Sequence, residues 1–171
     1  MFVDECSTNV SLRPLYAWSP RGERAHCSSP RNGGKNVTLL ASMTLSGMGP
    51  SLAVEGATTR AVFEAYVEEA LAPSLRPGQV VMDNLTAHEG ERVRGLIEVR
   101  GCKLVFLLPY SPDFNPIEQA FSWLKALLRG AEARAREALI EAMGVTLSAI
   151  SAWDASGFFG HCGYRTAAQL L

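Results

Sequence analysis

The pattern of apolar positions in the first half of the chain predicts three short strands. Apolar and β-branched residues predict strands at 2–3, 37–45 and 52–54, of which the first is cut short by the start of the chain. The glycines and the proline of 47–50 predict a turn between the second and the third. The stretch between the first two strands is rich in Pro, Gly, Ser and Arg and predicts no regular element.

Helical spacing of apolar residues separates these strands from later ones. Further strands are predicted at 79–82 and 103–108, the second followed by a proline-punctuated loop at 109–116. The predicted helices run from Thr58 or Thr59 to Pro73, from the capping box of Thr86 and Glu89 to Gly101, over 116–129 and over 132–150. The tail 151–171 is aromatic but aperiodic, and we expect it to pack on the core.

The alternation of strands and helices predicts an α/β fold, in which a mixed or parallel sheet carries helices on its faces. Active sites in such folds gather at the carboxyl ends of strands, and Asp83 lies at one such end. The chain has 171 residues, 47% of them apolar, which is enough for one substantial core. We therefore expect a single domain over 1–171.

Charge is nearly balanced over the whole chain but unevenly distributed. The net charge of −1 does not by itself indicate a nucleic-acid partner. Between positions 10 and 36, a single acid, Glu23, faces five basic residues: Arg13, Arg21, Arg24, Arg31 and Lys35. Between 121 and 136, Glu132 faces Lys125, Arg129, Arg134 and Arg136. Such local positive surface can hold phosphate, although each stretch alone is equally well explained as a solvated loop or helix face.

Cysteine usage and hydropathy indicate an intracellular chain. The four cysteines lie far apart without C-x-x-C spacing, which favours neither a disulfide framework nor a zinc ribbon. The pairs His26-Cys27 and His161-Cys162 could be zinc half-sites only if folding brought them together. No apolar run has the length of a membrane span, and the acidic start is unlike a secretory signal. We expect a cytoplasmic location.

Three acidic residues, Asp4, Asp83 and Glu118, lie at predicted element boundaries among apolar neighbours. Carboxylates that are buried or half-buried need partners, and no Lys or Arg adjoins Asp4 or Asp83 in sequence. Metal ions would supply the missing positive charge. Taken singly, Asp83 could belong to a simple turn, Asp4 could be an ordinary residue near a chain end, and Glu118 could complete a capping box with Asn115 as N-cap. The metal hypothesis therefore rests on the combination of all three acidic positions.

Oxygen ligands of this kind suit Mg²⁺, which binds one or two carboxylates and keeps several waters. Two such ions about 3.5–4 Å apart can activate a water or a 3′-hydroxyl and stabilise the leaving oxygen of a phosphodiester. The nucleophile then needs no protein side chain.

The segments around the three acids resemble the DDE transposases of the mariner superfamily, particularly the bacterial insertion-sequence branch. Their sequences are Phe-Val-Asp4-Glu, Val-Met-Asp83-Asn-Leu-Thr-Ala-His, and Leu-Pro-Tyr-Ser-Pro-Asp-Phe-Asn-Pro-Ile-Glu118 followed by Gln-Ala-Phe-Ser-Trp-Leu-Lys. The 34 residues 84–117 that separate Asp83 from Glu118 match the spacing of this branch. Trp-Ser-Pro-Arg-Gly22 is similar to its early loop, so the resemblance extends from residue 2 to about 164.

The resemblance implies a ribonuclease-H-like fold, two Mg²⁺ ions per site with Mn²⁺ as a substitute, and cut-and-paste DNA transposition. Asp4, Asp83 and Glu118 match the catalytic, metal-binding triad. The resemblance also implies that Asn84, His88, Tyr110, Asn115 and Lys125 line the site or touch DNA. For His88, a local hydrogen bond at a helix start is an equal alternative. From the charge pattern we add four DNA-contacting candidates in the early loop: Arg21, Arg24, Arg31 and Lys35. Paired element ends suggest a homodimer on DNA.

Two departures from the family bear on activity. No helix-turn-helix segment precedes Asp4, so recognition of element ends is expected to need a separate amino-terminal DNA-binding segment. The short first strand is expected to fray and weaken the placement of Asp4. An inactive product that inhibits the full-length enzyme, or a nonfunctional remnant, therefore remains as an alternative. A related junction resolvase is less favoured, because it gives no reason for the Ser-Pro-x-x-Asn-Pro-x-Glu stretch.

Overall fold

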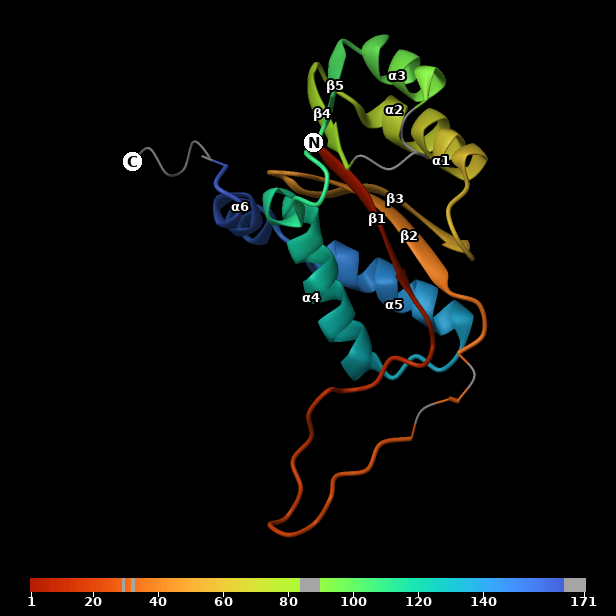
Figure 1. Cartoon of the computed structure of the whole chain (residues 1–171), viewed down its shortest axis with the longest axis vertical. Coiled ribbons are helices and arrows are strands. Elements are labelled where there is room, and N and C mark those ends of the chain that lie inside the picture. Colours follow the sequence, from red (N-terminus) through yellow and green to blue (C-terminus); the bar gives the residue numbers. More distant parts are fainter. Residues whose placement is uncertain (29, 32, 84–89, 165–171) are drawn as a thin grey trace.

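Five strands form one mixed sheet in the computed structural model, which describes residues 1–28, 30–31, 33–83 and 90–164 (Figure 1). They are β1 Phe2–Thr8, β2 Val37–Thr44, β3 Gly47–Glu55, β4 Gly78–Met82 and β5 Cys102–Phe106, in the order β3-β2-β1-β4-β5. The first three are antiparallel neighbours, whereas β4 and β5 run parallel to β1. The predicted mixed sheet is confirmed.

Helices cover both faces of this sheet, as predicted. They are α1 Arg60–Tyr66, η1 Val67–Leu71 and α2 Ala72–Ser74 in one continuous run, then α3 Glu91–Glu98, the short η2 Pro112–Phe114, α4 Pro116–Ala131, α5 Arg136–Ala149 and α6 Ala152–His161. None of the helices among the described residues is both long enough and apolar enough to cross a membrane.

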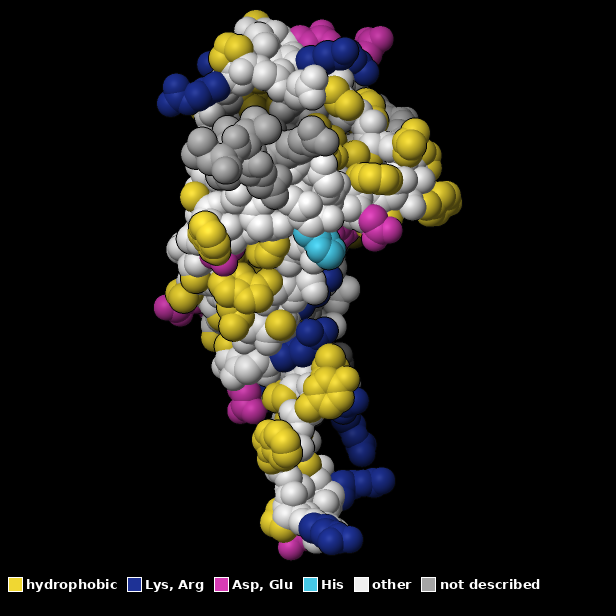
Figure 2. Space-filling view, turned by 90° about the vertical axis from the view of Figure 1, so that its left-hand side faces the viewer, with side chains coloured by type: hydrophobic (Ala, Val, Ile, Leu, Met, Phe, Trp, Pro, Cys, Tyr) yellow, Lys and Arg dark blue, Asp and Glu magenta, His cyan; other side chains and the backbone are white. Residues whose placement is uncertain are grey.

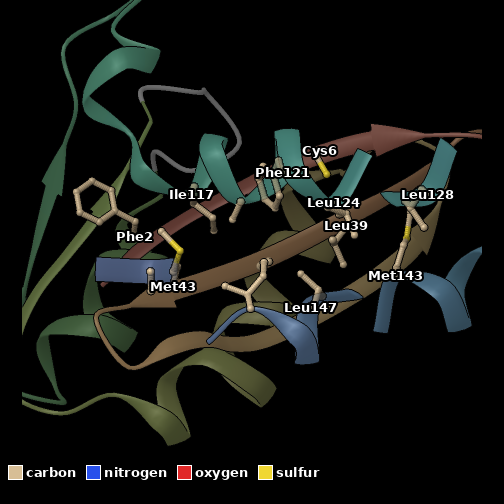
Figure 3. Close-up of a cluster of buried hydrophobic side chains, with 14 of the residues drawn as sticks. Phe2, Cys6, Leu39, Met43, Ile117, Phe121, Leu124, Leu128, Met143 and Leu147 are labelled. Carbon is tan, nitrogen blue, oxygen red and sulfur yellow. The ribbon is translucent and has the colours of Figure 1, made fainter. Parts of the chain in front are cut away.

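Each face of the sheet has its own hydrophobic core, because side chains alternate along the strands. Phe2 and Cys6 of β1 point to the face covered by α4, α5 and α6, where they join the cluster shown in Figure 3. Val3 points to the opposite face and packs with residues of α1, η1 and α3. Phe121 of α4 and Leu40 of β2 are fully buried, one in each cluster. The sheet is therefore protected on both sides.

Strand β1 corrects the expectation of a clipped first strand. It extends over seven residues, lies between β2 and β4, and pairs with β2 along its whole length. The sequence hid it because Asp4, Glu5, Ser7 and Thr8 interrupt any apolar run. Asp4 consequently lies inside a central strand, opposite Ala41, and not at a strand end.

The predicted turn at 47–50 is also wrong, since these residues begin strand β3. The chain reverses at Leu45-Ser46, and Thr44 already pairs with Gly47. A side chain at position 49 would place its Cβ 2.5 Å from Ser42 Oγ, so close strand approach explains Gly49. The glycines therefore have two roles: Gly47, with φ 114°, follows the reversal directly, and Gly49 packs against Ser42.

Helix boundaries were mostly predictable. Thr59 caps α1 by accepting a hydrogen bond from the Val62 N–H, and the run ends at Ser74, one residue beyond Pro73. Helix α5 begins four residues later than predicted, because Glu132 adopts a left-handed conformation after α4. The capping box of Thr86 and Glu89 lies outside the described residues.

Of the carboxyl-terminal tail, the structure describes residues 151–164, which lie against the core and contain the helix α6, where the sequence analysis expected no periodic element. Ser151 and Asp154 form a capping box at the start of α6. The buried Phe159 and the following Tyr164 both make edge-on ring contacts with Phe2. The buried residues of this helix, Ala155 and Phe159, are four positions apart, and the helix packs against α4, β3 and Phe2 of β1.

Between β1 and β2 the chain makes a long excursion, here named the arm (residues 9–36). Its described residues form no helix or strand, and it projects away from the sheet (Figure 1). Its two legs meet near the sheet, where Asn9 bonds to Asn36 (3.1 Å) and the Arg134 guanidinium donates to Leu12 O (2.7 Å) and Ser28 O (3.1 Å). Basic and hydrophobic side chains cover the projecting part (Figure 2).

Candidate active site

Three carboxylates from separate parts of the sequence line one hollow of about 340 Å³. Asp4 comes from β1, Asp83 directly follows β4, and Glu118 lies in the first turn of α4. The rest of the lining comes from the segment after β5 and the residue before α4: Leu107, Leu108, Pro109, Tyr110, Ser111, Pro112 and Asn115. The proline-rich loop thus forms one wall of the hollow.

The sheet register explains why Asp4 and Asp83 share this hollow. Phe2 pairs with Val81, and both pack into the cluster beneath α4. Val3 pairs with Met82, and both face the opposite cluster. Strand alternation then returns the next residue of each strand to the α4 side, so Asp4 and Asp83 lie next to each other on that face.

Asp4 is buried, with only 4% of its surface exposed, and both of its carboxylate oxygens accept hydrogen bonds. Its Oδ1 accepts from the Glu5 N–H at 2.7 Å, and its Oδ2 accepts from Asn115 Nδ2 at 2.7 Å. Hydrogen bonds to a carboxylate offset part of the cost of burying it. Asp4 is therefore held in the interior of the fold, although it is the fourth residue of the chain.

The capping-box alternative for Glu118 is wrong. Asn115 occupies the N-cap position of α4, but its side chain makes no capping bond. The Asn115 amide reaches Asp4 instead, while Glu118 is half-buried on the wall of the hollow. Glu118 therefore lines the hollow without belonging to a capping box.

A buried thiol lies close to this group of charges. Burial raises the pKa of the Cys6 thiol to about 12, and the charges of Lys125, Glu118 and Asp4 also act on it. Lys125 is half-buried and lies seven residues after Glu118, about two turns along the same face of α4. Its charge acts on Cys6, but Lys125 is not part of the lining of the hollow.

The other predicted site residues fall into three groups. Tyr110 and Asn115 line the hollow, and Tyr110 is fully exposed there in a left-handed backbone conformation (φ 58°). Asn84 and His88 lie outside the described residues. The structure places the remaining four candidates on the arm, away from the hollow: Arg21, Arg24, Arg31 and Lys35.

The donor atoms of the hollow fit a hard divalent cation, although they do not form a tight cluster. In the described ranges, no group of three or more His, Cys, Asp or Glu residues lies close enough to hold one ion. Mg²⁺ does not need such a group, since it commonly binds one or two carboxylates and fills its remaining positions with water or phosphate oxygen. The buried Asn115 Oδ1, which accepts no hydrogen bond from the described residues, adds another oxygen.

A mixed sheet in the order β3-β2-β1-β4-β5, with helices on both faces, is the architecture of a ribonuclease-H-like domain. The DDE superfamily endonuclease family matches residues 1–140, and the chain belongs to this family.

Comparisons with individual proteins agree with the family. The chain is 28% identical over 144 residues to the "Transposable element Tcb1 transposase" of Caenorhabditis briggsae, a match that spans 78% of this chain and 53% of the relative. It superposes on the Mos1 transposase paired-end complex with left transposon end (TM-score 0.73, 16% identity, 95% of this chain and 50% of that one). The chain also superposes on the Mos1 mariner paired-end complex with Mn, with a TM-score of 0.69 and 17% identity. This superposition covers 95% of this chain and 51% of the Mos1 chain. The chain thus spans about half the length of these relatives, and the superpositions confirm the ribonuclease-H-like fold.

Proposed function

We propose that the chain is a transposase catalytic domain that cleaves and joins DNA strands with the help of divalent metal ions. The observation that carries this proposal is the shared hollow, to which β1, β4 and α4 each bring one carboxylate. Three acids that are remote in sequence have no packing reason to meet there, and one of them, Asp83, follows the carboxyl end of β4, where α/β folds place active sites.

Asp4, Asp83 and Glu118 are the residues that would hold the ions, which we expect to be Mg²⁺, or Mn²⁺ as a substitute, two per site. When bound, such ions supply a hydroxide or activated 3′-hydroxyl and neutralise charge on the scissile phosphate. Asp4 is already oriented by two hydrogen bonds, so it need not reorganise. Relatives support the choice of cofactor, because the similar Mos1 complexes include one with Mn and one with Mg.

DNA is the proposed substrate and partner. One similar Mos1 structure is a paired-end complex with the left transposon end and another is a pre-cleavage transpososome, which supports this choice. The exposed Tyr110 at the edge of the hollow offers a ring on which a base could stack, and the basic arm offers phosphate contacts. Lys125, Asn84 and His88 remain proposed contacts within the family motifs.

Three finer assignments belong to this proposal. We infer membership of the bacterial insertion-sequence branch from the 34-residue spacing between Asp83 and Glu118. We infer action as a homodimer because two element ends require two active sites. Recognition of those ends would come from a separate amino-terminal DNA-binding segment.

The test combines Mn²⁺ binding with cleavage of element-end DNA. In the unaltered chain, Mn²⁺ at ten times its dissociation constant should add about 1.4 kcal/mol of stability, which raises Tm by a few degrees. The Glu118→Gln substitution removes a charge while keeping side-chain length, so we expect it to abolish cleavage and leave the fold intact. The control is Glu141→Gln, the same substitution at an exposed glutamate on α5. It should change neither Mn²⁺ binding nor DNA cleavage.

Two outcomes would contradict the proposal in different ways. If the Glu118→Gln variant cleaves at the normal rate, Glu118 is not a catalytic residue. A chain that neither binds Mn²⁺ nor cleaves, yet lowers transposition when co-expressed with a full-length enzyme, would instead be an inhibitor.

A further inference from the structure

Asn115 makes a buried contact that joins two of the three carboxylate-bearing elements. Its Nδ2 donates to Asp4 Oδ2 at 2.7 Å, across 111 positions of sequence. Both residues are nearly inaccessible, with 3% and 4% of their surfaces exposed. A charge-assisted hydrogen bond shielded from water in this way is stronger than a neutral one and is costly to lose.

The backbone holds Asn115 firmly in place. Its N–H donates to Pro112 O at 2.9 Å, and its C=O accepts from the Glu118 N–H at 3.1 Å. The next residue is Pro116, whose ring fixes φ at the first position of α4. The side-chain amide therefore starts from a rigid corner, and the same corner carries Glu118 into the hollow.

We propose that Asn115 is a positioning residue that sets the Asp4 carboxylate for metal binding and fixes the start of α4, with Glu118, against β1. This inference rests on the proposed function. With the Glu5 N–H on Oδ1 and the Asn115 amide on Oδ2, the Asp4 carboxylate has one fixed orientation. An ionised carboxylate offers about four acceptor sites, so hydrogen bonds and an ion can share the same group.

A competing role for Asn115 is direct ligation through its buried Oδ1. The two roles need opposite ends of the amide. Positioning requires the N–H donor, which aspartate lacks, whereas ligation requires an oxygen, which aspartate provides at the same place. Asn115→Asp therefore separates the two roles, and Asn115→Ala removes both.

The experiment measures the Mn²⁺ dissociation constant and Tm of the full 171-residue chain and its variants. Loss of a group that orients a metal ligand typically weakens binding by about 10–100-fold, and we expect this for Asn115→Ala and at least as much for Asn115→Asp. In an Asp4→Asn background, Asn115→Ala should weaken Mn²⁺ binding less than it does in the unaltered chain, because only the part of its effect that acts through Glu118 remains. Saturating Mn²⁺ should restore part of the cleavage activity of Asn115→Ala.

Tyr164→Phe is the matched control. The Tyr164 hydroxyl donates to Phe114 O at 2.8 Å, so it fastens the same corner one residue away without touching Asp4. The phenylalanine keeps the ring that contacts Phe2 and Phe159 and loses only this bond. Tyr164→Phe should lower Tm slightly. Its Mn²⁺ dissociation constant should stay within about twofold of that of the unaltered chain.

Several results would overturn the inference. A lower Tm with an unchanged Mn²⁺ constant for Asn115→Ala would make the role purely structural. Normal or tighter binding by Asn115→Asp would identify Oδ1 as a ligand instead, and this isosteric variant carries the test if Asn115→Ala does not fold. Failure of the unaltered chain to bind Mn²⁺ would overturn both proposals, whereas equal binding by the unaltered chain and Asn115→Ala would overturn this one alone.

Discussion

The sheet with its hollow and the arm are stabilised by different interactions. Around the hollow, α4 packs on β1 through side chains such as Phe121 and Leu124 that are completely removed from water. The arm places Tyr16 and Trp18 in solvent, and it is held near the sheet by hydrogen bonds, among them those of Arg134. Burial of apolar area stabilises the first region, and polar contacts fasten the second.

This difference explains where precise geometry can be maintained. A carboxylate that binds metal must be held in one orientation, and Asp4 gains that rigidity from a central strand covered by a helix. An arm that grips a flexible polymer needs reach and charge rather than exact placement. This difference agrees with the proposed function, in which the hollow carries the chemistry and the arm contacts DNA.

The largest effect that tests this contrast is expected in the core. Phe121→Ala removes a ring that is 0% exposed and should lower the free energy of unfolding by about 3–5 kcal/mol. Trp18→Ala, at a side chain 103% exposed, should stay within about 0.5 kcal/mol of the unaltered chain. Denaturant unfolding measures both. A loss for Trp18→Ala as large as that for Phe121→Ala would place the arm within the cooperative core.

A smaller effect is expected in DNA binding when charges on the arm are removed. Arg21→Ala and Arg24→Ala together should reduce the slope of log affinity against log salt by about 2 if each arginine contacts one phosphate. Unfolding should change little, because both side chains are exposed. Arg100→Ala, an exposed residue after α3 on the other face of the sheet, is the control. Unchanged salt dependence in the double variant would exclude these arginines as phosphate contacts.

The smallest effect concerns the ion pairs where the arm returns to the sheet. Hydrogen bonds from Lys35 and then Arg136 hold the pKa of the Glu55 carboxyl below its usual range, with Lys35 Nζ at 3.2 Å from Glu55 Oε1. A carboxyl whose pKa is lowered by folding stabilises the fold above its unfolded pKa of about 4.3, and this contribution is lost as pH falls through the folded-state value.

The corresponding variant is Glu55→Gln. It should be slightly less stable than the unaltered chain at pH 7, and the two should converge in acid and at high salt, where the exposed pairs are screened. Denaturant unfolding across pH measures the difference. A difference that persists unchanged below the folded-state pKa would mean that Glu55 acts through packing rather than charge.

Local sequence patterns predicted most helices and all but one of the strands in approximate position. Thr59 and the spacing of apolar residues after it predict the first helix, and Asn115-Pro116 predicts the start of α4. Asp4, Asp83 and Glu118 were predicted as one site, and the structure brings them to one hollow. These predictions worked because caps, prolines and periodicity act over a few residues.

Longer-range features needed the fold. The length of β1 depends on pairing with β2 and β4, since its own residues alternate acids and small polar side chains with apolar ones. Helix α6 has a local signal in its capping box of Ser151 and Asp154, but its burial depends on distant contacts such as that of Phe159 with Phe2. Neither contact leaves a local sequence pattern, because the partner residues lie far away along the chain.

By itself, then, the sequence determined the alternation of strands and helices, the acidic residues and the basic character of the arm, all of which follow from short-range chemistry. Only the tertiary structure decided that Asp4 lies in a central strand, that Asn115 turns away from its own helix to bind it, and that the basic arm lies apart from the hollow. Those outcomes depend on burial and on hydrogen bonds between distant segments, whose free energy exists only once the chain has folded.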